Sequence, residues 1–269
     1  MSLLQLTVLA LVQGITEFLP ISSSGHLILV PQMTDWEDQG LAMDIAVHVG
    51  TLGAVLLYFR SEVVRLGWGA VATLGLANGS SEAAGNKRLF WLLVLATVPV
   101  VIAGLALKTL GFDEQLRDPL IIAAASIGFG ILLYWADMAA PRVRQVSNLS
   151  VNHTLLIGLA QVTALIPGAS RAGTTMTAAR ALGYTRPEAA RFSMLMSMPT
   201  IAAAGLLLGL DVAETGTAIT ADMAIAAALA FLSALAAIHF LMRWLESASM
   251  TLFVVYRVAL GVFLLWWFV

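Results

Sequence analysis

The sequence contains no cysteine, which excludes disulfide bonds, thiol nucleophiles and cysteine-bound metals. Charged residues are also scarce: they make up 11% of the 269 residues, whereas soluble domains carry roughly 25%. No lysine or arginine precedes Arg60, so a cleaved signal peptide with a basic start is not expected. The net charge of −2 gives no reason to expect a nucleic-acid partner.

Apolar residues dominate the chain, at 59% of its residues and a mean hydropathy of +0.89. Six stretches approach the roughly 20 residues that a helix needs to cross a ~30 Å hydrocarbon core. They are Leu41 to Phe59, Leu89 to Leu110, Pro119 to Met138, Arg191 to Leu210, Asp222 to Leu241 and Met250 to Val269. We therefore predict an all-α polytopic membrane protein that forms a single domain over residues 1–269.

Basic residues are divided unequally between the connections of these six spans. If the spans alternate in direction, the connections on one side hold ten Lys and Arg residues and those on the other side hold only Lys108 and Arg117. The ten are Arg60, Arg65, Lys87, Arg88, Arg142, Arg144, Arg180, Arg186, Arg191 and Arg243. Because Lys-rich and Arg-rich loops stay in the cytoplasm, the second side and both chain termini are predicted to face outward.

Two further apolar segments break at a similar cluster of residues, 147 positions apart. Each break carries Thr, Pro and Ser at one spacing: Thr16, Pro20 and Ser23 in the first, and Thr163, Pro167 and Ser170 in the second. Backbone that leaves a helix at membrane depth exposes N–H groups that lipid cannot satisfy, so such breaks line a cavity or meet a ligand. We infer that both breaks contribute to a buried anion site.

The alternation of the spans also fixes how the broken segments enter the membrane. Residues 1–33 must start and finish outside, whereas residues 153–182 must start and finish inside. We therefore predict two re-entrant helical hairpins, each followed by three spans, in an inverted-topology repeat of about 1–138 and about 153–269. Folds of this kind place their site near the midplane, between the repeats.

Ionisable residues within these segments are candidates for function, because an ionised group at the centre of a spanning helix costs roughly 2.5 to 3.5 kcal/mol on insertion scales. Glu17 and His26 flank the first break, and Arg171 lies in the second. If the two hairpin tips meet near the midplane, an acid, an imidazole and a guanidinium converge there.

Hydroxyl residues and glycines surround these three side chains. The hydroxyl residues are Ser22, Ser23, Ser24, Ser170, Thr174 and Thr175, and the glycines are Gly25, Gly168 and Gly173. A guanidinium, hydroxyls and free N–H groups at helix starts form a cradle for phosphate, and glycine lets the backbone approach closely. The alternative is that these residues only help polar hairpins to pack.

Other polar residues are candidates for supporting roles. Gln13 lies four residues before Glu17, hence on the same helical face, where its amide could orient the carboxylate or bind a cation beside it. Asp44 and His48 share a helical face in the same way, and support the site from behind or bond to a neighbouring helix. Arg257 is expected to be structural, through a carboxylate or a carbonyl.

Two further short segments bear on helix packing and on nucleotide hydrolysis. Gly205-Leu-Leu-Leu-Gly209 has the spacing that permits close helix contact, which we expect within the chain, with a homodimer contact as the alternative. The segment from Pro167 to Thr175 lacks the Gly-Lys-Ser/Thr of a Walker loop, so nucleotide hydrolysis is not expected.

Two segments, Gln13-Gly-Ile-Thr-Glu17-Phe-Leu-Pro-Ile-Ser-Ser-Ser-Gly-His26 and Pro167-Gly-Ala-Ser-Arg-Ala-Gly-Thr-Thr175, resemble the signatures of bacterial undecaprenyl-diphosphate phosphatases of the bacitracin-resistance type. The resemblance covers essentially the whole chain. It implies an enzyme of the bacterial inner membrane that hydrolyses a polyprenyl diphosphate lipid to the monophosphate, recycles this carrier for peptidoglycan synthesis and confers bacitracin resistance. It also implies help from a divalent cation, Mg2+ or Ca2+.

The resemblance also implies roles for individual residues. Glu17, Ser23, His26 and Arg171 match the catalytic set, Ser170 and Thr175 match phosphate contacts, and the other substrate-binding candidates are Gln13, Ser22, Ser24, Gly25, Gly168, Gly173 and Thr174. Gln13 stands where many members have Glu, so cation binding would depend more on Glu17 than on Gln13. Ala172 replaces the usual Ser, so a necessary role for that hydroxyl is not expected.

Three routes of phosphoryl transfer stay open at this point. Ser23 activated by Glu17 or His26 could attack, His26 could attack directly, or Glu17 could activate water; we favour Ser23. The competing class of function is a membrane transporter or flippase for an anionic or polyprenyl-phosphate substrate, because inverted repeats and broken helices are typical of transporters.

Overall fold

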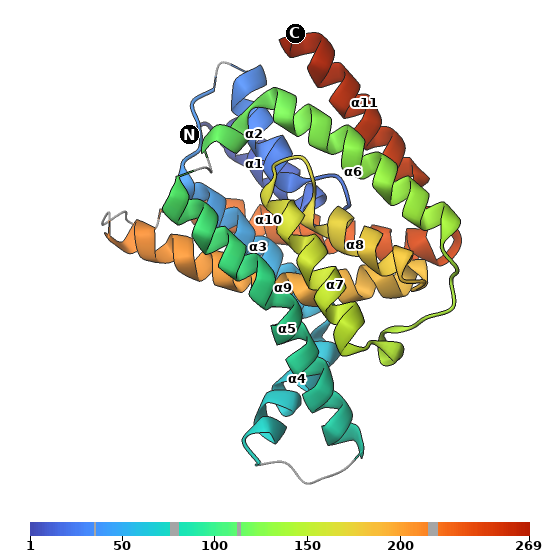
Figure 1. Ribbon diagram of the computed structural model, residues 1–269. Helices are drawn as coiled ribbons and strands as arrows, with labels where there is room; N and C mark the ends of the chain where they lie inside the picture. Colours follow the sequence, from blue (N-terminus) through green and yellow to red (C-terminus); the bar gives the residue numbers. More distant parts are fainter. Residues whose placement is uncertain (35, 76–80, 112–113, 215–219) are drawn as a thin grey trace.

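The computed structural model describes residues 1–34, 36–75, 81–111, 114–214 and 220–269, which form helices and no strand (Figure 1). Six helices are long and apolar enough to cross a membrane. They are α3 (Leu41–Tyr58), α5 (Ser81–Leu110), α6 (Pro119–Ala139), α9 (Arg186–Glu214), α10 (Ala221–Ser247) and α11 (Thr251–Phe268). Each coincides with a predicted span, so the prediction of an all-α multi-pass membrane protein is confirmed.

Shorter helices form the two broken segments. The first is α1 (Leu3–Thr16) followed by α2 (Ser23–Met33), and the second is α7 (Val151–Val162) followed by α8 (Arg171–Ala181). A 3-10 turn, η3 (Thr163–Leu165), extends α7, and the connecting elements are α4 (Arg60–Thr73), η1 (Glu114–Arg117) and η2 (Val146–Asn148). Both predicted breaks are therefore present.

Side-chain caps explain where several helices begin. The Ser2 hydroxyl accepts from the Gln5 amide, and the Gln5 side chain accepts from the Ser2 amide, which completes a capping box at α1. Asp118 caps α6 by accepting from the Leu120 amide, and Ser150 caps α7 by accepting from the His153 amide. These caps satisfy N–H groups that a helix start leaves without a partner.

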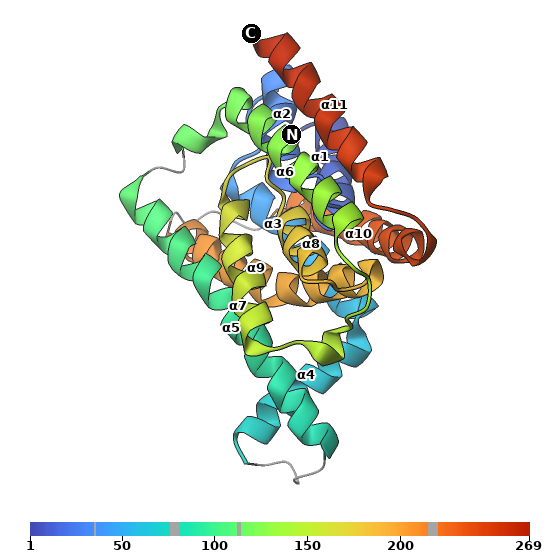
Figure 2. The same ribbon diagram turned by 45° about the vertical axis from the view of Figure 1, so that its right-hand side comes forward.

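The short helices pack on long helices from the other half of the chain. Helix α1 packs on α10, and α7 packs on α5 (Figures 1 and 2). Glycine permits both approaches: a Cβ on Gly14 would lie 2.6 Å from the Ala230 carbonyl oxygen of α10, and a Cβ on Gly158 would lie 2.6 Å from the Ala96 carbonyl oxygen of α5. Helix α3 joins the halves by packing on α9 and α10, and α6 packs on α11.

A buried ion-pair network fixes the far end of α8. The Asp137 carboxylate accepts from Arg180 Nε at 3.0 Å and from Arg186 Nη2 at 2.7 Å. It also accepts from the Met250 amide at 3.2 Å. Arg180 is fully buried and donates in addition to backbone carbonyls of the loop after α6. The network thus joins α6, α8, α9 and the start of α11.

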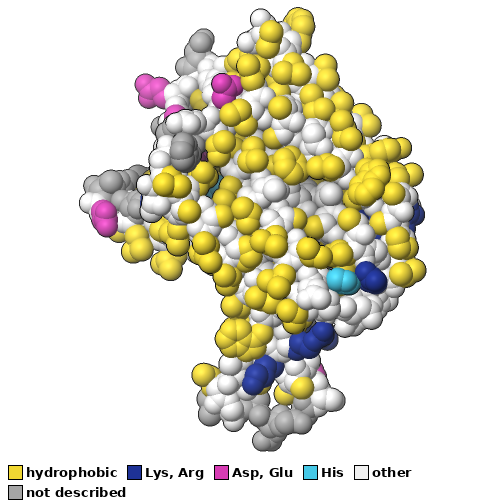
Figure 3. Space-filling model, in the orientation of Figure 1, with side chains coloured by type: hydrophobic (Ala, Val, Ile, Leu, Met, Phe, Trp, Pro, Cys, Tyr) yellow, Lys and Arg dark blue, Asp and Glu magenta, His cyan; other side chains and the backbone are white. Residues whose placement is uncertain are grey.

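The surface separates charge by sign. In Figure 3, acidic side chains gather toward the upper left and basic ones toward the lower and right-hand parts of this face, with hydrophobic side chains between them. Such a band is expected where a protein meets lipid, because only apolar side chains are compatible with the hydrocarbon region.

The packing role predicted for Gly205 and Gly209 was wrong. A Cβ at either position would meet no described atom within 4 Å, because both glycines face open space on α9. The spacing alone could not show which way this helix face turns. A homodimer stays a prediction.

Candidate active site

The two turns that interrupt the helix pairs share an unusual backbone conformation. Ser22 has φ 75° and ψ 96°, and Ser170 has φ 70° and ψ 115°. They are the non-glycine residues with positive φ in the described part of the chain. Each hydroxyl caps its own helix, Ser22 by accepting from the Gly25 amide and Ser170 by accepting from the Gly173 amide. Backbone strain of this kind clusters at functional sites.

The two turns are in direct contact. The Ser22 hydroxyl accepts a hydrogen bond of 3.1 Å from the Gly168 amide, which links the α1–α2 turn to the α7–α8 turn. Gly168 has φ +92°, and a Cβ there would lie 2.5 Å from the Ile122 carbonyl oxygen of α6. A side chain would therefore strain the turn and strike α6 as well.

Glu17 is the centre of the polar contacts around these turns. It is 8% exposed, and its Oε2 accepts from Ser23 Oγ at 2.6 Å and from Gln13 Nε2 at 3.0 Å. Its Oε1 accepts from Arg171 Nη2 at 2.8 Å. The predicted meeting of the acid near the first break and the guanidinium near the second is thus present in the structure.

Arg171 is held by more than its ion pair. Its side chain is 12% exposed, Nη1 donates to the Ser193 carbonyl of α9 at 3.2 Å, and Cζ lies 5.7 Å from the centre of the Phe18 ring. A guanidinium stacked near an aromatic ring and fixed by a carbonyl keeps its fork in one orientation.

His48 lies directly beside Glu17. Its Nε2 is 3.8 Å from Glu17 Oε2, and its side chain is 35% exposed. Its Nδ1 donates to the Asp44 backbone carbonyl at 2.7 Å, which leaves Nε2 as the nitrogen that faces Glu17. The Asp44 carboxylate instead accepts from Gln39 Nε2 at 2.8 Å. Asp44 therefore reaches the site only through His48.

His26 points away from Glu17. Its Nδ1 lies 2.6 Å from the Ser22 carbonyl oxygen, and its Nε2 lies 2.6 Å from the Tyr256 hydroxyl of α11. Because a carbonyl only accepts, Nδ1 carries the proton and Nε2 accepts from Tyr256. The convergence of all three ionisable groups is therefore only partial: the structure unites Glu17 and Arg171, and His26 braces the Ser22 turn.

The hydroxyl residues divide into two groups. Ser24 is exposed and Ser23 is half-buried, so both are available to a ligand. Thr174 and Thr175 are buried and donate to the Arg171 carbonyl within α8. Thr175 also lies 2.7 Å from the Ser193 hydroxyl. The two threonines thus order the first turn of α8.

Three residues near the site were missed in the sequence. Phe18 stacks near Arg171, Ser193 contacts both Arg171 and Thr175, and Tyr256 bonds to His26. Phe18 lies inside the first signature segment, so it could have been found there. Ser193 and Tyr256 lie on long helices whose rotation the sequence does not give.

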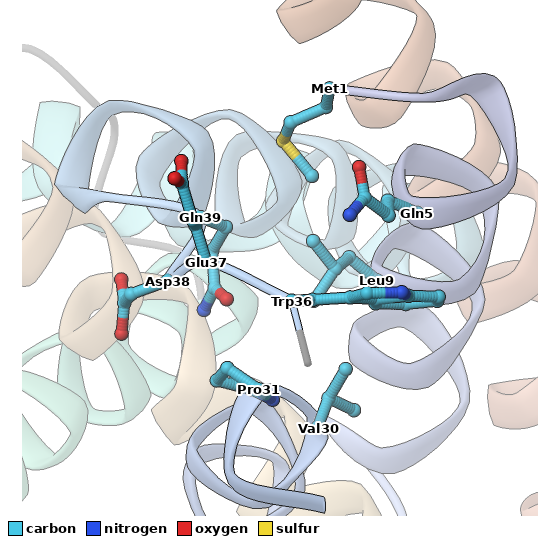
Figure 4. A pocket seen from close by; sticks show the side chains of 9 residues that line it. All are labelled: Met1, Gln5, Leu9, Val30, Pro31, Trp36, Glu37, Asp38 and Gln39. Atoms are coloured by element: carbon cyan, nitrogen blue, oxygen red, sulfur yellow. The ribbon is translucent and has the colours of Figure 1, made fainter. Parts of the chain in front are cut away.

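Two cavities border α1 and α2, the first of them at the end away from the turns. One, of about 230 Å³, is lined by Met1, Gln5, Leu9, Val30, Pro31, Trp36, Glu37, Asp38 and Gln39 (Figure 4). The other, of about 240 Å³, includes His26 among otherwise mostly apolar residues: Val8, Val12, Leu29, Val30, Met33, Thr34, Trp36 and Leu260. Only the second reaches a predicted catalytic residue.

Glu17 and Gln13 are the predicted ligands for a cation. Among the described residues, no three His, Asp or Glu side chains lie together as a metal site. The Gln13 amide oxygen, however, is buried and has no hydrogen-bond partner. Carboxylate and amide oxygens are ligand types that suit a Mg2+ ion, which would take its other ligands from water and phosphate. The Gln13 amide, however, turns its nitrogen and not this oxygen toward Glu17.

Comparison with known proteins shows the family of this chain. Residues 6–263 match the family model described as bacitracin resistance protein BacA. The chain belongs to the BacA family. It is 51% identical to a protein of Roseobacter denitrificans and 52% identical to one of Ruegeria pomeroyi, each over 98% of both chains. Both are named undecaprenyl-diphosphatase. A protein of Stutzerimonas stutzeri named undecaprenyl-diphosphatase 2 is 49% identical, also over 98% of both chains.

Proposed function

We propose that this BacA-family protein hydrolyses undecaprenyl diphosphate to undecaprenyl phosphate and inorganic phosphate. The observation that carries the proposal is the buried contact of Glu17 and Arg171 beside Ser23. An acid that holds a hydroxyl and a guanidinium that can bind phosphate suit phosphoryl transfer, which depends mainly on positioning and charge stabilisation. The family and its relatives' names support the same activity.

Arg171 is the proposed ligand of the diphosphate. Arg171 pairs with Glu17, and a phosphate that replaces this carboxylate would meet the same planar fork. Free N–H groups at the start of α8 lie beside it, since Arg171 is the first residue of that helix. Positive charge and helix N–H groups then face the oxygens on which charge develops.

Ser23 is the proposed nucleophile, and Glu17 the base. The serine oxygen bonds to the terminal phosphorus, its proton passes to Glu17, and the bond to the bridging oxygen breaks so that undecaprenyl phosphate leaves with that oxygen. Glu17 then loses this proton to solvent, takes one from an attacking water and returns it to the serine oxygen as phosphate departs. His26 faces Tyr256 and not Ser23, so Glu17 is the better-placed base.

A divalent cation, Mg2+ or Ca2+, is proposed as the cofactor, with Glu17 and the free oxygen of Gln13 as its protein ligands. When bound, such an ion neutralises charge on the diphosphate oxygens. Gln13 also donates to Glu17 through its nitrogen. Because this bond turns the amide nitrogen toward Glu17, the amide must rotate for its oxygen to bind the same ion as the carboxylate.

The helix pairs are proposed to be re-entrant hairpins of an inverted repeat. Two features support this: Ser22 and Ser170 cap α2 and α8 with the same conformation, and the hairpins exchange partners, since α1 packs on α10 and α7 on α5. Helices α5 and α10 are the second spans of their halves, so this exchange relates the halves symmetrically. The site then lies between the repeats.

The acidic end of the molecule is proposed to face outward from a bacterial inner membrane. The unequal distribution of Lys and Arg between the connections supports this orientation, which places both termini outside. The isoprenoid tail would stay in lipid while the diphosphate enters between the turns. This arrangement suits the recycling of a carrier lipid for peptidoglycan synthesis and hence bacitracin resistance.

Phosphate release from undecaprenyl diphosphate in detergent tests the proposal. We expect release by the wild type and by Arg65→Ala, whose arginine is exposed on α4, and a loss of at least about 100-fold in Glu17→Ala and Arg171→Ala. A wild type that moves the lipid across liposomes without releasing phosphate would instead indicate a flippase.

A further inference from the structure

Arg257 on α11 is a buried cation without a carboxylate partner. Its side chain is fully buried, and the ion pairs of the described residues do not include it. An unpaired buried charge is costly and is retained where backbone dipoles or a ligand compensate it. Arg180, equally buried, shows the usual solution, because Asp137 neutralises it.

The partners of Arg257 are backbone carbonyls of both strained turns. Nη1 donates to the Pro20 carbonyl of the α1–α2 turn at 3.2 Å. Nη2 donates to the Gly168 and Ala169 carbonyls of the α7–α8 turn, each at 2.9 Å. Nε donates to the Ser126 carbonyl of α6 at 3.2 Å. One planar fork thus spans the two hairpins and ties them to α6 and α11.

Small residues make room for this fork. A Cβ on Gly173 would lie 2.6 Å from Arg257 Nη1, and a Cβ on Gly130 would lie 3.3 Å from Arg257 Cβ. The guanidinium therefore lies directly against the first turn of α8, the helix that Arg171 begins. The Ala169 carbonyl and the Ser170 N–H belong to one peptide unit, in which C=O and N–H point in opposite directions. Because the carbonyl points toward Arg257, the Ser170 N–H points away from it.

From these contacts we infer that Arg257 is a positioning residue, which holds the two turns together so that Glu17 and Arg171 can share one phosphate site. The inference rests on the proposed phosphatase function for its kinetic consequence, but its structural consequence stands alone. Besides Arg257, the Ser22–Gly168 hydrogen bond is a direct link between the turns. Without the fork, the peptide groups of both turns lose their common anchor, and Glu17 and Arg171 separate.

The test combines kinetics with a distance measurement. Arg257→Met and Arg257→Lys are compared with Arg180→Met, the matched control that removes another fully buried arginine at the far end of α8. We expect kcat to fall by at least about 100-fold in both Arg257 variants, as when reacting groups are displaced by an ångström. Arg180→Met should lose thermal stability but retain its kcat.

Spin labels report the hairpins directly, because the chain has no native cysteine. Ile15→Cys on α1 and Leu159→Cys on α7 are exposed positions near the two turns. Their distance distribution should be narrow in the parent and in Arg180→Met, and broad or shifted in both Arg257 variants. If Arg257→Met does not fold, Arg257→Lys decides, because it keeps the buried charge but not the planar fork.

The experiments distinguish a failure of the positioning role from a failure of the proposed phosphatase function. Folded Arg257 variants with parental distances and a kcat comparable to wild type would overturn the positioning role. A wild type that releases no phosphate would overturn the proposed phosphatase function, and the spin-label distances would still test whether Arg257 clamps the turns.

Discussion

At the scale of single residues, Glu17 and Arg171 contact each other and their neighbours through different atoms. The carboxylate receives Arg171 on one oxygen and Ser23 with Gln13 on the other. The guanidinium keeps one nitrogen on the Ser193 carbonyl, which orients the rest of the fork. Each residue thus has one interaction that fixes its position and another that a diphosphate can replace.

Replacing Arg171 with lysine tests the planar fork. We expect Arg171→Lys to lower kcat/KM for undecaprenyl diphosphate by roughly 10² to 10³-fold, because an ammonium cannot bind phosphate with two parallel hydrogen bonds. Steady-state phosphate release measures this. Arg65→Lys on exposed α4 is the control and should match the wild type; near-normal turnover by Arg171→Lys would contradict the cradle.

Ser23 can be tested by trapping the intermediate. With terminally labelled substrate and an acid quench, the wild type should carry labelled phosphate on Ser23, because its hydroxyl already donates to Glu17 at 2.6 Å. Ser24→Ala, next along the chain and exposed, is the control and should still be labelled. Absence of label, together with activity in Ser23→Ala, would favour water activated by Glu17.

At the scale of elements, the positions of the two turns were predicted correctly, but the correspondence between their serines was not. The spacing of Thr, Pro and Ser located both breaks, yet it paired Ser23 with Ser170. In the structure Ser22 is the counterpart of Ser170, since both have positive φ and cap their helices through a glycine three residues later. The Ser-x-x-Gly spacing, which both turns share, indicates this pairing. It is easily missed because Ser22, Ser23 and Ser24 are consecutive.

A glycine substitution tests the strained turn. Gly168→Ala should destabilise the protein by at least about 1 kcal/mol, because its φ of +92° is unfavourable for alanine. Activity should fall further, since the same Cβ presses on Ile122. Gly128→Ala on α6, where a Cβ meets open space, is the control and should be neutral or slightly stabilising. Denaturant unfolding and phosphate release measure both, and an unaffected Gly168→Ala would contradict the strained turn.

At the scale of the whole molecule, composition and the length of apolar runs predicted the six spans, although α5 begins at Ser81 and not at Leu89, and α10 ends at Ser247 and not at Leu241. A spanning helix needs a continuous apolar run that is long enough to cross the hydrocarbon core, and such a run can be read locally from the sequence. Helix rotation is not local. It decided that Gly205 and Gly209 face open space, that His26 turns toward Tyr256, and that Arg257 reaches carbonyls of both turns.

Labelling of single cysteines tests the proposed orientation. In whole cells, an impermeant maleimide should label Val269→Cys, which is exposed at the C-terminus, and not Leu74→Cys, which is exposed after α4. Permeabilised cells should label both, and the cysteine-free parent gives the background. The reverse pattern would place the termini inside.

The most direct test of the shared site is a double-mutant cycle between the hairpins. Phosphate release is measured for wild type, Glu17→Gln, Arg171→Met and the double variant. If both side chains serve one phosphate site, the double variant should be no slower than the slower single variant, because residues that act as a unit are not additive. Losses that multiply would show that Glu17 and Arg171 act independently, and would contradict the account.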